Sequence, residues 1–337
     1  MSEDQPHILP PARLPLSKPS VKISFVGSLQ LPRLIADAGD DAIARFLEFF
    51  AANIRNPNTR KAYLRNALAF LRWCEARDVA DLKQIRPFIV AAYIEEIQLT
   101  LSKPSVKQHL ASIRMLFDWL VTGQIVPVNP ASSVRGPKYV VKVGKTPILT
   151  AAETRQLLDG IDGSDVLGLR DKAIIASMVY SFARVGAMVA MRVEDYYIQG
   201  RRSRVRLHEK GGKLHTVPAH HNLEAYMDAY IEKAGIADDR KGPLFRTANG
   251  KTKTLNRLHM RPADVWRMIR HRAKQAGIKT MIGCHSFRAT GITCYMSNGG
   301  TLENAQMIAG HESPRTTKLY NRSADEVTLD EVERIVI

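Results

Sequence analysis

Four residues near the carboxyl end of the chain combine the side-chain types that phosphate chemistry requires. His285 and Arg288 are three positions apart, so on a helix they share a face and can bind one oxyanion together. His311 follows a glycine and shortly precedes a Ser-Pro pair, which predicts a helix boundary. Tyr320 lies nine residues further on, after a short polar and basic segment. Each residue type alone is more often structural than catalytic, but the joint pattern predicts a phosphate site.

This pattern resembles the tyrosine recombinase (phage integrase) family. The signature of that family is Arg, Lys, His-x-x-Arg, His or Trp, and then a nucleophilic Tyr. His285, Arg288, His311 and Tyr320 match its last four elements in order and spacing, and residues 309–313, Ala-Gly-His-Glu-Ser, are similar to its Leu-Gly-His-x-Ser segment. The resemblance covers about residues 40–337 and implies an enzyme, a DNA-breaking and rejoining recombinase.

Two further residues match the beginning of the signature. Arg184 stands among apolar residues, where burial without an anion would be expensive, although a salt bridge to a core carboxylate is an alternative. Lys210 precedes Gly211-Gly212, which predicts the turn of a hairpin over residues 204–218. An ordinary charged turn is the alternative there. The family places its lysine in a similar Lys-Gly-x-Lys turn, which favours Lys210 over Lys213.

The resemblance implies a metal-free and cofactor-free cleavage of DNA through a 3′-phosphotyrosine. Arg184 and Arg288 would clamp the phosphate with planar, bidentate donors. His285 would accept the phenolic proton or hydrogen-bond the phenol, because a free tyrosine has a pKa near 10. His311 would hold a phosphate oxygen, and Lys210 would act as the general acid toward the leaving hydroxyl.

One position departs from the family pattern. The family has an acidic residue three positions after its first arginine, and here that position is Ala187. Either another carboxylate, such as Glu194 or Asp195, replaces it, or the site is less rigid.

Composition agrees with a folded, DNA-binding chain. The 337 residues are 45% hydrophobic, enough for two domains with their own cores, and the net charge of +16 predicts an anionic partner. Charge alone leaves a membrane surface or a ribosome open. The chain has no run of about 18 apolar residues, and its first residues are polar and acidic, unlike a secretory signal. We therefore expect a cytoplasmic, nucleoid-associated protein and no membrane contact.

Three cysteines, Cys74, Cys284 and Cys294, form no metal-binding spacing. An odd count indicates a reducing compartment. Cys284 stands beside His285, but four ligands cannot be assembled around it, so we expect no metal.

Periodicity and breakers predict a mainly α-helical chain with a small β-sheet or hairpin. The resemblance implies two domains in a C-shaped clamp, an all-helical core-binding domain and a mixed α+β catalytic domain. The expected divisions are an N-terminal arm (1–40), the helical domain (41–133), a basic linker (134–148), the catalytic domain (149–322) and a C-terminal helix (323–337), which could pack on its own domain or on a neighbouring protomer.

Local signals place several helices within these domains. Helices are expected from Asp41, from Asn58 as a cap, over 87–98 and over 105–120. Thr150 and Glu153 form a capping-box pattern. Residues 167–180 predict a buried helix, and a basic helix follows Pro262.

Basic residues outside the signature are candidates for DNA-backbone contacts. Such contacts set affinity and register rather than sequence choice. The alternative for each is a solvated surface charge, or for the linker a plain tether. The candidates are Lys103, Lys107, Arg114, Arg135, Lys138, Lys142, Lys145, Lys213, Arg257 and Arg261.

The sequence thus predicts a site-specific recombinase acting on double-stranded DNA, as a tetramer on two duplexes. A type IB topoisomerase-like enzyme is one rival. A catalytically inactive architectural DNA-binding protein is the other.

Overall fold

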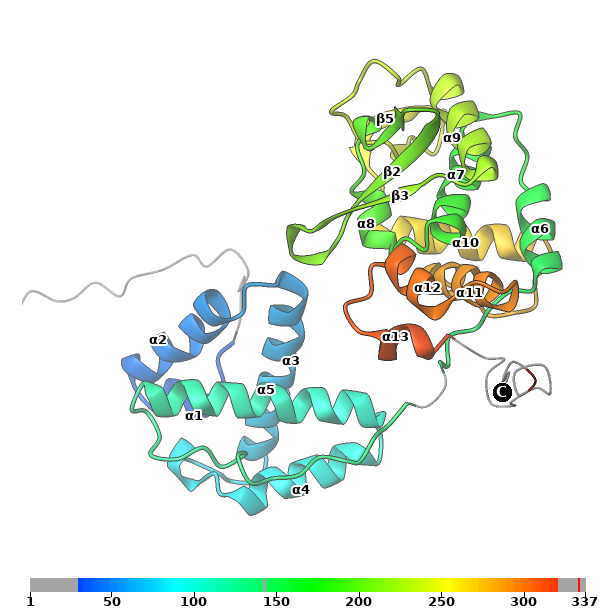
Figure 1. Cartoon of the computed structure of the whole chain (residues 1–337). Helices are drawn as coiled ribbons and strands as arrows, with labels where there is room; N and C mark the ends of the chain where they lie inside the picture. Colours follow the sequence, from blue (N-terminus) through cyan, green and yellow to red (C-terminus); the bar gives the residue numbers. More distant parts are fainter. Residues whose placement is uncertain (1–29, 142–143, 321–332, 334–337) are drawn as a thin grey trace, which may run out of the picture. The chain divides into compact units, whose positions relative to one another are not determined.

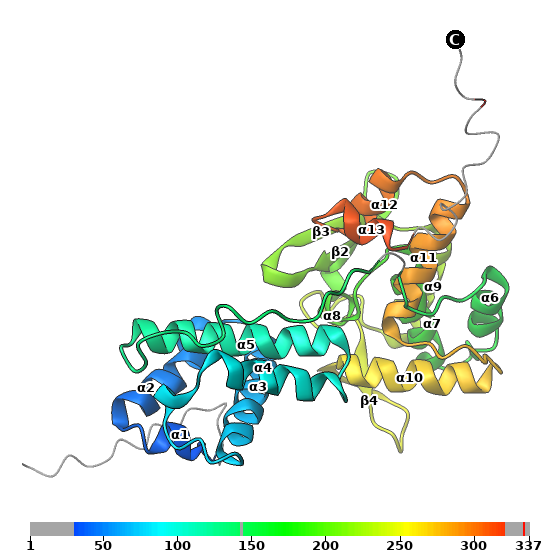
Figure 2. The same ribbon diagram turned by 90° about the horizontal axis from the view of Figure 1, so that it is seen from below.

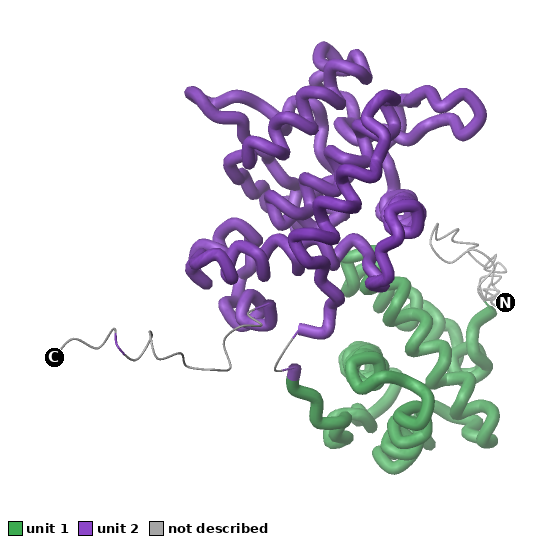
Figure 3. Tube along the Cα trace, turned by 90° about the vertical axis from the view of Figure 1, so that its right-hand side faces the viewer, with its two compact units in different colours: residues 1–140 green, residues 141–337 purple. Residues whose placement is uncertain are grey.

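The computed structural model describes residues 30–141, 144–320 and 333. The chain divides into two compact units, residues 1–140 and 141–337 (Figure 3). The division falls inside the segment for which the sequence predicts a linker.

Parts of the predicted organisation lie outside the described residues. These are most of the N-terminal arm, Lys142, and the C-terminal helix apart from Glu333. The last residues of the expected arm belong to the fold of unit 1, because Leu34 and Ile35 are buried in its core.

The described part of unit 1 is entirely helical (Figure 1). Its elements are α1 (Arg33–Ala36), α2 (Asp40–Glu48), a π-helical segment η1 (Phe49–Asn53), α3 (Pro57–Glu75), a 3-10 turn η2 (Leu82–Gln84), α4 (Pro87–Gln98) and α5 (Lys103–Thr122). α3 packs against α4 and α5. Phe70 of α3 meets Tyr93 of α4 and Phe117 of α5 edge to face, with ring centroids 5.1 and 6.3 Å apart. Edge-to-face aromatic pairs add specificity to apolar burial.

The cap of α3 differs from the sequence prediction. The side-chain oxygen of Asn56 accepts hydrogen bonds from the backbone N–H groups of Asn58 and Thr59, at 3.0 and 3.2 Å. Pro57 occupies the first helical position, where its missing N–H costs nothing. The predicted cap, Asn58, is therefore inside the first turn.

Unit 2 combines helices with two small antiparallel sheets (Figures 1 and 2). Its helices are α6 (Ala151–Asp159), α7 (Val166–Tyr180), α8 (Val185–Val189), α9 (His221–Ala234), α10 (Pro262–Gln275), α11 (Cys284–Ser297), α12 (Leu302–Ala309) and α13 (Pro314–Lys318). Its strands are β1 (Tyr196–Gln199), β2 (Arg202–His208), β3 (Leu214–Pro218), β4 (Arg246–Ala248) and β5 (Leu255–His259), with 3-10 turns η3 (Val193–Asp195) and η4 (Lys210–Gly212).

The predicted hairpin is β2–β3, and it is one part of a three-stranded sheet with the order β1-β2-β3. Val205 pairs with Val217 in this register, and both side chains are buried in the core of unit 2. Gly211 and Gly212 have φ of 81° and 80°, a left-handed conformation that suits glycine. Strand β1 and the β4–β5 sheet were not predicted from the sequence.

Helix α7 lies at the centre of unit 2 and packs against α9 and α11. The capping box at the start of α6 is confirmed: Thr150 accepts from the N–H of Glu153 at 3.1 Å, and Glu153 accepts from the N–H of Thr150 at 2.9 Å. Neither α7 nor any other helix in the described ranges has both the length and the apolar character needed to cross a membrane.

The Asn56 cap leads to a stability prediction. Asn56→Ala removes the acceptor for two backbone donors and should lower the free energy of unfolding by about 1 kcal/mol. Urea unfolding followed by circular dichroism measures this change. Asn58→Ala is the matched control and should change stability by less than about 0.5 kcal/mol, because the side chain of Asn58 is exposed. A larger loss in the Asn58 variant would contradict the assignment.

Candidate active site

Helix α11 carries His285 and Arg288 one turn apart, as their spacing predicts. The helix approaches α7 closely at Gly291, where an added Cβ would lie 2.1 Å from the carbonyl oxygen of Val179. This approach encloses Arg288, whose side chain is among the largest that are fully buried.

The guanidinium of Arg288 is held by backbone carbonyls. Nη1 donates to the carbonyl of Phe182, just after α7, and Nη2 donates to that of Ala309, the last residue of α12, at 2.7 Å. Within the described residues Arg288 has no carboxylate partner, and its buried Nε has no hydrogen-bond acceptor. A buried cation with an unpaired donor is costly unless an anion joins it.

Arg184 precedes α8 and forms an ion pair with Glu209, the residue that follows β2. The distance from Nη1 of Arg184 to Oε2 of Glu209 is 2.6 Å. The side chain of Glu209 is 7% exposed and that of Arg184 is 42% exposed, so the arginine retains an open face. The salt bridge considered as an alternative for Arg184 is therefore present, on a carboxylate that the sequence analysis did not single out.

The end of α12 positions His311. Gly310 ends this helix with φ of 58°, and a left-handed residue at this place is the usual way to stop a helix. His311 is buried, and its Nδ1 lies 2.8 Å from the hydroxyl of Thr317 on α13.

Tyr320 follows α13 and lies between the two histidines. Its hydroxyl is 2.7 Å from Nε2 of His285. Its ring is nearly parallel to that of His311, with 9° between the planes and 5.9 Å between the centroids. The backbone is anchored as well, because Thr293 of α11 donates to the carbonyl of Tyr320 at 3.1 Å.

Burial and positive charge shift the pKa values of this cluster. Burial, then the charges of Arg288 and Arg184, lowers the pKa of His311 to about 3 and holds the pKa of His285 below its usual value of 6.5. Burial, then the charge of Arg184, lowers the pKa of Arg288 to about 10. At neutral pH both histidines are therefore neutral while Arg288 stays charged. A neutral His285 can accept a hydrogen bond from the hydroxyl of Tyr320.

The hairpin is joined to the same region. Nε2 of His215, on β3, lies 2.9 Å from the carbonyl oxygen of Ile308 on α12. The backbone of Lys210 lies in the turn directly after Glu209. The site thus unites the predicted Arg184, His285, Arg288, His311 and Tyr320, and the Lys210 turn adjoins Glu209.

The carboxylates considered as replacements at Ala187 are engaged elsewhere. Asp195 accepts hydrogen bonds from Arg206 and pairs with His208, each at 2.7 Å, and Glu194 lies 3.7 Å from Arg192. The carboxylate that contacts Arg184 is instead Glu209. The sequence feature that could have indicated Glu209 is its position beside Lys210, as the only acidic residue between positions 196 and 223.

Most predicted DNA-contact residues are exposed. These are Lys103, Lys107, Arg135, Lys138, Lys145, Lys213, Arg257 and Arg261. Arg114 is different, because its Nε donates to the carbonyl of Ala131 at 3.0 Å and its Nη2 donates to that of Val134. Arg114 therefore fixes the end of unit 1, and its contact with DNA stays a prediction.

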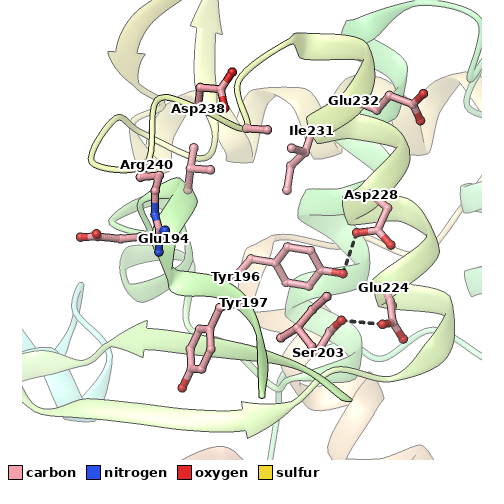
Figure 4. A pocket seen from close by; sticks show the side chains of 13 residues that line it. Glu194, Tyr196, Tyr197, Ser203, Glu224, Asp228, Ile231, Glu232, Asp238 and Arg240 are labelled. Carbon is pink, nitrogen blue, oxygen red and sulfur yellow. Dashed lines mark hydrogen bonds between the residues drawn. The ribbon is translucent and has the colours of Figure 1, made fainter. Parts of the chain in front are cut away.

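One cavity of unit 2 lies apart from the predicted catalytic residues. It has a volume of about 830 Å³, and Figure 4 shows it between β1, α9 and the loop that carries Asp238 and Arg240. None of the predicted catalytic residues lines it. The described ranges also contain no group of three or more His, Cys, Asp or Glu side chains arranged to hold a metal ion.

Comparisons with known proteins identify relatives of both units. The profile described as "Phage integrase family" matches residues 147–327, and that described as "Phage integrase, N-terminal SAM-like domain" matches residues 43–124. The chain is 25% identical over 288 residues to tyrosine recombinase XerD of Listeria innocua, covering 83% of this chain and 93% of the relative. It is 30% identical over 231 residues to tyrosine recombinase XerC of Chlamydia muridarum, covering 67% and 69%.

Solved structures share the fold. The XerH recombinase bound to its difH substrate has a TM-score of 0.64 at 15% identity, covering 90% of this chain and 96% of that one. A lambda integrase dimer bound to a COC′ core site has a TM-score of 0.64 at 18% identity, covering 90% and 86%. The expected mainly helical fold with small sheets is confirmed.

One close backbone contact next to Tyr320 leads to a prediction. The N–H of Gly144 donates to the carbonyl of Leu319 at 2.8 Å, and an added Cβ at Gly144 would lie 2.6 Å from that oxygen. Gly144→Ala should therefore displace residues 317–320, accelerate their amide hydrogen exchange, and lower stability by about 1–3 kcal/mol.

Hydrogen exchange followed by mass spectrometry measures this displacement. Gly250→Ala is the control, because no heavy atom lies within 4 Å of its added Cβ and its φ is not positive. Unchanged exchange over residues 317–320 in the Gly144 variant would contradict the prediction.

Proposed function

Because the chain belongs to the phage integrase family, whose tyrosine recombinases cleave and rejoin DNA, we propose that it is a site-specific recombinase using Tyr320 as its nucleophile. It breaks one DNA strand by forming a 3′-phosphotyrosine. A 5′-hydroxyl of another strand then attacks this phosphorus, which forms a new phosphodiester and releases Tyr320. Integration, excision or resolution of DNA, including that of a mobile element, would each use this exchange. The observation that carries the proposal is the 2.7 Å contact between the Tyr320 hydroxyl and His285, beside the buried and incompletely paired Arg288.

The proposed cleavage step begins at that contact. The oxygen of Tyr320 attacks phosphorus, and its proton passes to Nε2 of His285, which is neutral at pH 7. The bond from phosphorus to the 5′-oxygen breaks, and Lys210 supplies a proton to that oxygen. The new phosphotyrosine ester conserves the energy of the broken bond. When the strands are rejoined, the same groups act in the reverse order.

The remaining residues act on the non-bridging oxygens. Arg288 contributes its buried positive charge, and Arg184 offers the donors that Glu209 does not use. If the Thr317 hydroxyl donates to Nδ1 of His311, the neutral imidazole carries its proton on Nε2 and can donate it to a phosphate oxygen. Fixed donors of this kind are each worth roughly 3 kcal/mol in a transition state.

We further propose that double-stranded DNA is held by the exposed basic residues of both units and that the working assembly is a tetramer on two DNA sites. A lambda integrase tetramer bound to a Holliday junction, with a TM-score of 0.63, supports the oligomer by likeness of fold. Residues 323–337 would join neighbouring protomers.

Covalent trapping tests the nucleophile. Wild-type protein incubated with supercoiled DNA carrying the flanking sequence of its own gene should yield a denaturation-resistant protein–DNA adduct. Tyr320→Phe should yield none, with DNA affinity within about twofold, because only the phenolic oxygen is lost. Tyr295→Phe is the matched control and should form the adduct. An adduct in the Tyr320 variant would refute the assignment.

The products separate the rival functions. Recombined molecules support a recombinase, and relaxed circles alone support a topoisomerase-like enzyme. Tight DNA binding by wild type without any adduct would support an inactive architectural protein.

The lowered pKa of His285 leads to a pH prediction. Below its pKa this histidine is protonated and cannot accept the phenolic proton, so the single-turnover cleavage rate should fall with decreasing pH through a midpoint below 6.5. His285→Gln cannot titrate, so its slower cleavage should lack that step. A wild-type midpoint above 6.5 that disappears in the Gln variant would contradict the direction of the shift.

A further inference from the structure

Two positive charges meet in this site, and one carboxylate offsets them. Arg184 and Arg288 are close enough that the charge of Arg184 lowers the pKa of Arg288, whereas Glu209 raises it. Position 187, where the family pattern has an acid, is a buried alanine and supplies no charge. Glu209 is therefore the carboxylate on which the arrangement of Arg184 depends.

The backbone holds Glu209 in place. Its N–H donates to the carbonyl of Lys213 at 2.8 Å, which closes the turn 210–212 at the end of the hairpin. The turn needs two consecutive glycines with positive φ, so its path is specified by the sequence. The carboxylate thus projects from a fixed point, and a 93%-buried side chain has little freedom to leave it.

The contact leaves Arg184 competent to bind a phosphate. Glu209 accepts from Nη1 only. In the portion of the chain that is described, the donors on Nε and Nη2 of Arg184 have no acceptor, and this edge of the guanidinium can bind an oxyanion bidentately. A carboxylate that competed with the phosphate would occupy that edge instead.

We propose that Glu209 is a positioning residue for strand cleavage: it orients the guanidinium of Arg184 toward the phosphate and supplies the negative charge that position 187 lacks. This inference rests on the proposed function. Because Glu209 precedes Lys210, this role connects the end of the hairpin with the arginines proposed to bind the phosphate.

Single-turnover cleavage of a nicked DNA substrate tests the role. Glu209→Ala should slow adduct formation by about 10- to 100-fold, because misplacement of a catalytic group by about 1 Å costs that much. Its DNA affinity should stay within about threefold. Glu209→Gln should lose less, because its amide oxygen can still accept from Nη1 of Arg184.

A double-mutant cycle separates positioning from a general structural effect. In an Arg184→Ala background, Glu209→Ala should cause less than about a twofold further loss, because the residue through which Glu209 acts is gone. The same fold-loss in both backgrounds would overturn the proposal, as would a wild-type rate for Glu209→Ala. Glu194→Ala, which removes a nearby carboxylate paired with Arg192, is the matched control and should retain the wild-type rate.

A second readout does not require activity. The guanidinium NMR signals of Arg184, assigned with Arg184→Lys, should show hindered rotation in wild type and free rotation in Glu209→Ala. Hindered rotation in both proteins would overturn the Glu209 proposal. If wild type formed no adduct, the proposed function would fail, and the NMR comparison would still decide whether Glu209 orients Arg184.

Discussion

The burial of a guanidinium without a carboxylate partner is the constraint around which unit 2 is arranged. Arg288 is 1% exposed and is held by two carbonyls that lie at or just beyond helix ends. The last carbonyls of a helix lack internal partners and carry the negative end of its dipole, so they stabilise a cation that would otherwise be too costly to bury. This applies to the carbonyl of Ala309, the last residue of α12, whereas Phe182 lies beyond the end of α7 and its carbonyl belongs to the segment that follows.

The other site residues follow from that arrangement. Burial, reinforced by the positive charges of Arg288 and Arg184, lowers the pKa values of His285 and His311 and keeps both histidines uncharged at neutral pH. In the proposed reaction a charged imidazole could not accept the phenolic proton, so the arginines would favour the neutral base as well as bind the phosphate. Glu209 limits the repulsion between the two guanidinium groups without covering the free edge of Arg184.

Local features of the structure were predictable from the sequence, and contacts between distant segments were not. The His285–Arg288 spacing, the Thr150 capping box and the Gly211-Gly212 turn each depend on neighbours within a few residues. Asn56 and Asn58 carry the same side chain two positions apart, and only the backbone conformation distinguishes the cap.

The pairing of Arg184 with Glu209 joins residues 25 positions apart, and no local sequence pattern predicts it. The position of Tyr320 against His285 spans 35 residues. The family resemblance predicted that these two residues share a site, but only the fold determines which atoms meet. The three-stranded sheet was underestimated for a related reason, since β1 has four residues and gains its order by pairing with β2.

The hydrogen bond from Gly144 to Leu319 joins the entrance of unit 2 to the residue before Tyr320. This hydrogen bond therefore couples the backbone at the start of unit 2 directly to the backbone beside Tyr320, without a link through the core. A glycine at this point keeps that link short, since any larger residue would push the two backbones apart.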